Sequence, residues 1–273
     1  MGRPKTLLVL GHPGHELRIW QWLCQEKPTV CILTDGSGAT GQSRLAVTDR
    51  TFERAGARFA THFSGVSDAQ IYTAVLDQDL DFFVTVAAQI RDLLLAESFD
   101  IVVGDGSEGY NPTHDICRLL IDAAVQSAAH QGRHVLNYSF PLMGHPKGYR
   151  QAADDILVEL TDEQLQQKTE LITAYGAEAG GMLTTEIADT FDKFGQQAFK
   201  QERLFLTRLP QAEPQQVVEK PFYERHGEQR VAEGVYRYVI RYNEHIHPIH
   251  CRLMAWANEA VDSLQDDKTV SHA

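Results

Sequence analysis

Short apolar runs alternate with longer amphipathic stretches through the first half of the chain, and this alternation restricts the fold more than any other feature. The runs predict strands at Thr6–Leu10, Thr29–Leu33, Asp100–Gly104 and Arg133–Tyr138. Helices are predicted between them, near Glu16–Gln25, Arg44–Ala55, Asp79–Glu97 and Thr113–Gln131. Strands that are apolar along their whole length suit a sheet covered on both faces. Because alternation with helices gives right-handed crossovers, we predict an α/β fold: a Rossmann-like, doubly wound, mostly parallel sheet with helices on both faces, plus a C-terminal extension.

The sequence changes character after about residue 160. Thr161 followed by Gln164 matches a capping box and predicts a helix start. We expect residues 1–180 to form one α/β domain. Residues 181–273 would then form an extension packed on that domain, either as a lid or as an oligomerisation arm. The alternating aromatic segment Val235–Tyr242 fits packing or an interface, so a homo-oligomer is one interpretation.

Composition narrows the choice of partners and location. The formal net charge is −12, whereas a nucleic-acid partner would require a basic face. No apolar run approaches the roughly 20 residues that a membrane span needs, so no membrane insertion is expected. The first apolar run is too short for a signal peptide. The four cysteines show no C-x-x-C pairing and fit thiols in a reducing compartment, which favours a cytoplasmic location.

Doubly wound sheets bind ligands beyond the carboxyl ends of their strands, and two histidines follow the first predicted strand. The loop reads Gly-His-Pro-Gly-His-Glu over residues 11–16. His12 and His15 can converge at this strand-to-helix turn, and neutral imidazoles are good zinc ligands. The alternative is a pair of ordinary loop histidines, with Glu16 favouring the helix N-terminus. A dinucleotide loop is less consistent, since G-x-G-x-x-G would need glycine where these side chains stand.

A third histidine stands at the corresponding place in the second half of the sheet. His114 begins the helix that follows the strand at Asp100–Gly104, so it can meet His12 and His15 at the same edge. Its alternative role is capping or packing. Cys117, one turn further on, has apolar neighbours and is a core thiol rather than a fourth ligand. The sequence therefore predicts Zn²⁺, or another divalent metal, on the three histidines.

A second histidine-rich segment, His245–His250, is a weaker metal candidate. His245 and His247 would share one face only if the segment were extended. Histidine-rich sequence alone is a weak signal.

The ordered motifs resemble those of the PIG-L/LmbE-like (GlcNAc-PI de-N-acetylase-type) metal-dependent deacetylase family. Residues 11–16 are similar to the family's A-H-P-D-D-E motif, and Asn111–His114 to its later H-P-D-H motif. Weaker similarities, in the family's order and spread over about residues 5–180, are the T-N-G turn at Thr34–Gly36, the substrate arginine at Arg44, the E-G-Y approach at Glu108–Tyr110, and Lys168 with Tyr175 in the K-x-x-A-x-x-x-Y helix.

The resemblance implies a divergent member. His12 and His114 match family ligands, and His15 takes the place of the ligand aspartate. Gly14 replaces the family's general base, and Asn111 replaces the histidine credited with stabilising the oxyanion. A zinc ion on three histidines can lower the pKa of its bound water to about 7, but amide cleavage still requires a proton for the leaving amine.

Several residues are candidates for the altered chemistry. Asp105, at the end of its strand, is our first substitute for the missing acid, followed by Glu16 and His145. The amide of Asn111 can still donate to an oxyanion. We assign substrate binding to Arg44, Asp35, Tyr110 and His145.

The resemblance implies a hydrolase of a carbon–nitrogen amide bond, removing acetyl from an N-acetylated amino sugar or its conjugate. Glycine-rich turns around Gly36, Gly38 and Gly41 would leave room for a sugar. The alternative is a metal-binding protein that has lost hydrolysis and serves a binding or regulatory role, since Gly14 lacks the acid. A plain nucleotide-binding domain is a third interpretation.

Overall fold

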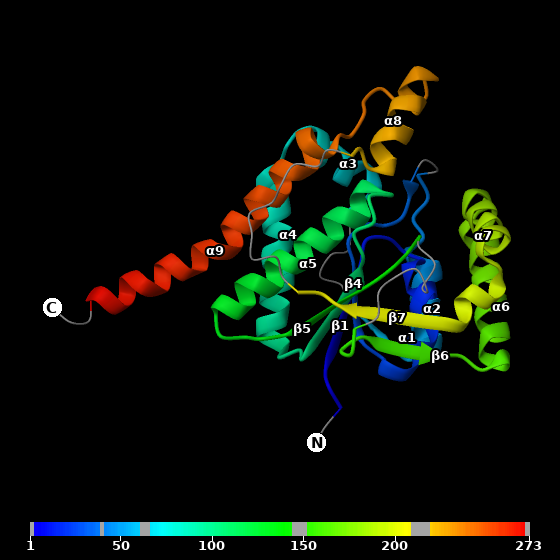
Figure 1. The fold of residues 1–273 in the computed structure, drawn as a ribbon, viewed down its shortest axis with the longest axis horizontal. Coiled ribbons are helices and arrows are strands. Elements are labelled where there is room, and N and C mark those ends of the chain that lie inside the picture. Colours follow the sequence, from blue (N-terminus) through cyan, green and yellow to red (C-terminus); the bar gives the residue numbers. More distant parts are fainter. Residues whose placement is uncertain (1–2, 39–40, 61–65, 144–151, 209–218, 271–273) are drawn as a thin grey trace.

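A seven-stranded sheet in the order β3-β2-β1-β4-β5-β7-β6 forms the centre of the protein (Figure 1). A computed structural model describes residues 3–38, 41–60, 66–143, 152–208 and 219–270. The first five strands along this order are parallel, β7 pairs antiparallel with β5, and β6 pairs antiparallel with β7. The strands are β1 (Thr6–Leu10), β2 (Thr29–Ile32), β3 (Arg58–Phe59), β4 (Ile101–Asp105), β5 (Leu136–Phe140), β6 (Ile156–Glu159) and β7 (Gln201–Leu206). The predicted α/β fold with a mostly parallel sheet is confirmed.

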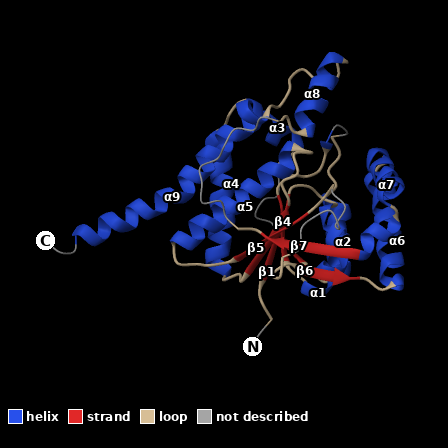
Figure 2. Ribbon diagram, viewed as in Figure 1, coloured by secondary structure: helices blue, strands red, loops and turns tan. Residues whose placement is uncertain are grey.

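Helices cover both faces of the sheet (Figure 2). Leu7 and Val9 of β1 belong to a core shared with α4 (Leu80–Glu97), α5 (Pro112–His130) and α9 (His247–Val270). Leu8 and Leu10 point the other way, toward α1 (Trp20–Glu26) and α2 (Leu45–Ala55). Because successive strand residues point to opposite faces, a strand covered on both sides is apolar throughout.

The order of the strands reverses at β1. The chain leaves β1 for β2 on one side and later returns to β4 on the other, with Val9 opposite Gly104. A Cβ at Gly104 would lie 2.8 Å from the Val9 carbonyl oxygen, so glycine permits this close approach. The loops after β1 and β4 therefore flank the crevice where open α/β sheets bind ligands.

The segment after residue 160 extends the same sheet. The helix predicted at Thr161 is α6 (Asp162–Ala179), with its capping box to Gln164 in place. It is followed by α7 (Gly181–Phe194) and β7, which lies between β5 and β6. The domain boundary at residue 180 stays a prediction. β7 follows residue 180 in the sequence but belongs to the same sheet as the strands before it.

A fully buried ion pair fastens this second half to the first. Lys168 Nζ on α6 donates to Glu202 Oε1 of β7 over 2.6 Å and to the Arg18 carbonyl oxygen over 2.8 Å. The Glu202 carboxylate also accepts the backbone N–H groups of Gln21 and Trp22 at the start of α1. One carboxylate thus joins a strand, a helix and a helix N-terminus.

One predicted strand start is wrong, and the condition for a second metal site is not met. β5 begins at Leu136 rather than Arg133, because the Arg133 N–H still donates to the Ala128 carbonyl and closes the end of α5. The segment around His245 is not extended: a π-helical turn spans Tyr242–Ile246 and α9 begins at His247. Residues two apart on a helix do not share a face, so the geometric basis for a second metal site is lost.

The aromatic segment predicted at Val235–Tyr242 carries no strand over residues 235–241. Tyr236 and Tyr238 are exposed there, and their use as an oligomer interface stays a prediction. In the described part of the chain, no helix is both long enough and apolar enough to cross a membrane.

Candidate metal centre

Three histidines from the two loops at the switch point lie together. His12 and His15 follow β1, His15 opening a short 3-10 helix (His15–Ile19), and His114 lies in the first turn of α5 after β4. Each offers one ring nitrogen, and these atoms lie within 4.8 Å of one another. The ring centroids are 4.5–5.2 Å apart. Among the described residues, no other group of three or more metal-binding side chains gathers in this way.

The environment of the histidines favours neutral imidazole. His12 and His114 are only 6% and 7% exposed. Burial, together with the neighbouring histidines, lowers the pKa of His114 well below 6.5. Burial likewise lowers the pKa of His12, although contact with Asp68 opposes the change. Neutral rings keep a lone pair for a metal.

An unsatisfied nitrogen supports the fit to a metal ion. His114 Nδ1 is buried and has no hydrogen-bond partner among the described residues. Leaving such an atom unpaired costs free energy, which explains why buried unsatisfied groups are rare outside functional sites. Three imidazoles are also a donor set that suits zinc and several other divalent transition metals.

Asp105, the last residue of β4, lies behind His15. Its Oδ2 atom is 2.8 Å from His15 Nδ1 and accepts the Gly11 N–H over 2.7 Å. With Nδ1 held by a carboxylate, His15 has Nε2 for a metal, which is a common arrangement around metal-binding histidines. A Cβ at Gly11 would lie 2.7 Å from Asp105 Oδ2, so glycine is required for this contact. The predicted catalytic role of Asp105 stays a prediction.

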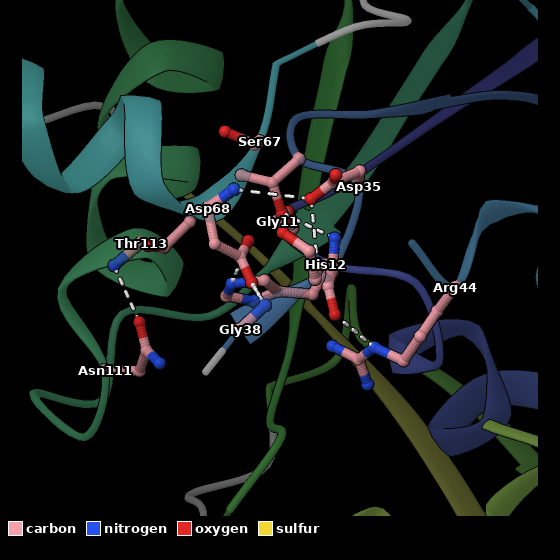
Figure 3. Close-up of polar contacts among 12 residues, drawn as sticks. Gly11, His12, Asp35, Gly38, Arg44, Ser67, Asp68, Asn111 and Thr113 are labelled. Atoms are coloured by element: carbon pink, nitrogen blue, oxygen red, sulfur yellow. Dashed lines mark hydrogen bonds and ion pairs between the residues drawn. The ribbon is translucent and has the colours of Figure 1, made fainter. Parts of the chain in front are cut away.

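Asp68 is the neighbour of the cluster that the sequence did not reveal. It lies at the start of α3 (Asp68–Leu76), and its Oδ1 atom is 3.3 Å from His12 Nε2 (Figure 3). Burial would raise the pKa of this carboxyl, but contact with His12 outweighs it and holds the pKa well below its usual range. The capping box of Ser67 and Gln70 could have located the helix start, but not its position beside His12.

A side chain at position 14, where the resembling family has an acid, would be strained and tightly packed. Gly14 has a φ of 104°, which side chains rarely adopt. A Cβ there would lie 3.2 Å from Tyr175 Cε1 and 3.3 Å from its hydroxyl oxygen. The Tyr175 hydroxyl is 2.6 Å from Thr48 Oγ1, and burial raises its pKa. Both the backbone and the packing of Tyr175 therefore fit glycine at this position.

Glu16 is a buried carboxyl group beside the cluster. Its Oε2 accepts the Gly14 N–H over 2.8 Å, while Oε1 has no hydrogen-bond partner among the described residues. Burial raises the pKa of Glu16 to about 7.

This shift predicts a pH-dependent gain in stability for Glu16→Gln in metal-free protein. Folded Glu16 titrates near 7 and unfolded Glu16 near its ordinary 4.5, so ionisation destabilises the folded state as pH rises through that window. Glutamine removes this term, and we expect the variant to be more stable by up to about 3 kcal/mol above pH 7.

Urea unfolding of chelator-treated protein across pH 4.5–8 measures the difference. The advantage of the variant should shrink as pH falls toward about 4.5, and an advantage independent of pH would contradict the assignment. The titrations of His12 and His114 occur in both proteins and cancel in the comparison.

Two of the residues predicted to bind substrate, Asp35 and Arg44, lie on the His12 side of the site and hydrogen-bond to the backbone (Figure 3). Asp35 Oδ1 accepts the backbone N–H groups of Ser37 and Asp68 and shapes the loop after β2. Arg44 Nε donates to the Gly36 carbonyl oxygen over 2.7 Å, with its guanidinium facing the His12 side of the loop (Figure 3).

Two further predicted residues come from the loop before α5. Asn111 Oδ1 accepts the Thr113 N–H over 2.8 Å, so its oxygen caps the helix while its amide nitrogen remains a donor. Tyr110 is stacked on Phe222, with ring centroids 4.7 Å apart, and is 38% exposed. His145 lies outside the described residues. The substrate roles of all these residues stay predictions.

Cys117 is 1% exposed, and its thiol lies 3.9 Å from the Val9 carbonyl oxygen. It is a core thiol, as predicted.

No protein family profile matches the chain, and no curated protein sequence matches it. Among solved structures, the A40926 pseudoaglycone deacetylase Dbv21 gives a TM-score of 0.49 at 16% identity, over 77% of this chain and 100% of that chain. The zinc-inhibited form of teicoplanin deacetylase Orf2 gives 0.46 at 13% identity, over 74% of this chain and 98% of that chain. At these values, neither likeness identifies the activity of this chain.

Proposed function

We propose that the protein is a zinc-dependent hydrolase of a carbon–nitrogen amide bond, and that it removes acetyl from an N-acetylated amino sugar or its conjugate. The observation that carries the proposal is the cluster of His12, His15 and His114 at the switch point, with two of the rings buried and kept neutral. The motifs shared with PIG-L/LmbE-like deacetylases support the choice of reaction. Zinc bound there would supply Lewis-acid polarisation and a water acidic enough to attack an amide near pH 7.

The chain's own residues would orient the reactants and handle protons. Asp105 holds His15 in position by accepting a hydrogen bond from Nδ1. The Asn111 amide nitrogen would donate to a developing oxyanion. Glu16, whose pKa lies near neutrality, can hold a proton for the leaving amine at Oε1. Arg44, Asp35, Tyr110 and His145 would contact the sugar.

Metal removal and amine release test the proposal together. Purified protein should contain close to one zinc per chain and release free amine from at least one of a panel of N-acetylated sugars. Treatment with a chelator should abolish release, and added zinc should restore it. Protein that binds neither zinc nor another divalent metal after metal-free purification and reloading would contradict the proposal.

A metal-binding protein without hydrolysis is the second candidate. The observation that favours it is Gly14 at the position of the resembling family's base, where the positive φ and the neighbouring Tyr175 ring disfavour a larger side chain. Bound zinc with no amine released from any substrate in the panel would support this candidate.

An Asp105→Asn variant that keeps full amine release would remove Asp105 from the mechanism.

A further inference from the structure

The two oxygens of the Asp68 carboxylate differ in hydrogen bonding. Oδ2 accepts the Gly38 N–H over 2.6 Å, which ties α3 to the loop after β2. Oδ1 is buried and accepts no hydrogen bond from the described residues, although Asp68 is only 4% exposed. A buried carboxylate oxygen without a donor is costly unless a cation compensates for it.

Oδ1 lies at the edge of the histidine cluster. It is 3.3 Å from His12 Nε2, and Figure 3 shows the Asp68 carboxylate directed at the His12 ring. Two ligands held about 2.0–2.1 Å from one tetrahedral zinc ion lie about 3.3 Å apart. The observed separation is therefore the one expected for two atoms that share a metal.

Charge supports the same conclusion. Three neutral imidazoles contribute no charge, whereas a buried divalent cation is stabilised by nearby anions. Two buried carboxylates contact the cluster, Asp68 at His12 and Asp105 at His15. Asp105 meets His15 through Oδ2, which also accepts the Gly11 N–H, and its unpaired oxygen is Oδ1. In Asp68 the unpaired oxygen, Oδ1, is itself the atom beside a histidine ring, so Asp68 is the carboxylate we assign to the metal.

We propose that Asp68 belongs to the coordination set of the metal, together with His12, His15 and His114. The carboxylate that the resembling family supplies from position 15 would here come from α3, a different element of the fold. The three histidine nitrogens lie within 4.8 Å of one another and Asp68 Oδ1 lies beside His12, so a bound metal ion would draw the four side chains together. This inference rests on the proposed metal site but not on hydrolysis.

Metal binding by Asp68→Asn tests the proposal. Asparagine keeps a carbonyl to accept the Gly38 N–H, so the loop contact is preserved while the charge is removed. We expect zinc affinity, measured by competition with a chromophoric chelator, to fall by about 100-fold or more. The visible absorption of the Co²⁺-substituted protein should also change, because a ligand is lost.

Two variants serve as controls. Asp105→Asn removes a carboxylate that contacts a ligand histidine from outside, so it should weaken zinc binding while leaving the cobalt spectrum close to wild type. Asp81→Asn removes a carboxylate that is 92% exposed, and so controls for the change in net charge. It should change neither the zinc affinity nor the cobalt spectrum.

The outcomes separate the inference from the proposed function. A wild-type protein that binds no metal contradicts the proposed function itself. A wild-type protein that binds zinc, with an Asp68→Asn affinity within about twofold, overturns only the role of Asp68. Weaker binding with an unchanged cobalt spectrum also overturns direct coordination. If the variant does not fold, a zinc-loaded crystal structure of the wild type shows whether Asp68 is a ligand.

Discussion

Replacing His15 with alanine is expected to weaken zinc binding by more than about 100-fold. Zinc binding at a structural site contributes roughly 10–16 kcal/mol of free energy over four ligands, or about 3 kcal/mol for each ligand. The variant should lose more binding free energy than one ligand contributes, because the alanine also leaves the buried Asp105 carboxylate without the imidazole that it contacts. Chelator competition on the purified variant measures the change.

His134→Ala is the matched control for this experiment, since His134 is exposed and lies outside the cluster. It should bind zinc as tightly as the wild type. Equal zinc affinity in His15→Ala and wild type would remove His15 from the site and contradict the three-histidine centre.

Replacing Lys168 with methionine is expected to destabilise the protein by about 3–5 kcal/mol, a large part of the 5–15 kcal/mol typical of a folded domain. The Lys168 and Glu202 side chains are both fully buried, so the variant leaves a carboxylate in the interior without its countercharge. Its remaining donors are two backbone N–H groups of α1. Urea unfolding at pH 7 measures the loss.

Two further variants make the result interpretable. Lys200 forms an ion pair with Asp162 at the surface, and Lys200→Met should cost less than about 1 kcal/mol. The double variant Lys168→Met/Glu202→Gln has no buried carboxylate charge, and the Gln side-chain oxygen can still accept a backbone N–H of α1. It should therefore be more stable than Lys168→Met alone. A double variant that is less stable than the single one would contradict this account.

The histidine cluster was predictable because its position follows from a general rule. Continuous apolar runs indicated a sheet covered on both faces, and such sheets bind ligands at the carboxyl ends of neighbouring strands. His12, His15 and His114 each follow a strand that the sequence shows clearly. The strands at the edges of the sheet were less visible: β6 and β7 alternate buried and partly exposed positions and carry charged residues, so neither reads as an apolar run.

The partners of the histidines were not predictable in the same way. Asp68 comes from a helix 56 residues after His12, and its sequence neighbourhood indicates only a helix start. Tyr175 meets Gly14 across an interval of more than 150 residues. Lys168 matched a family motif, yet its ammonium group is buried against Glu202, where it joins elements of the fold.

The parallel part of the sheet and the three histidines could be predicted from the sequence, because strand periodicity and strand-to-helix turns are local properties of the chain. The folded structure was needed to show which carboxylates face those histidines, which oxygen of Asp68 is left without a hydrogen bond, and why position 14 suits glycine. These depend on distances between segments remote in sequence and on the removal of water from between them. Burial is also what keeps the imidazoles neutral and raises the pKa of Glu16, and burial is a property of the packed molecule.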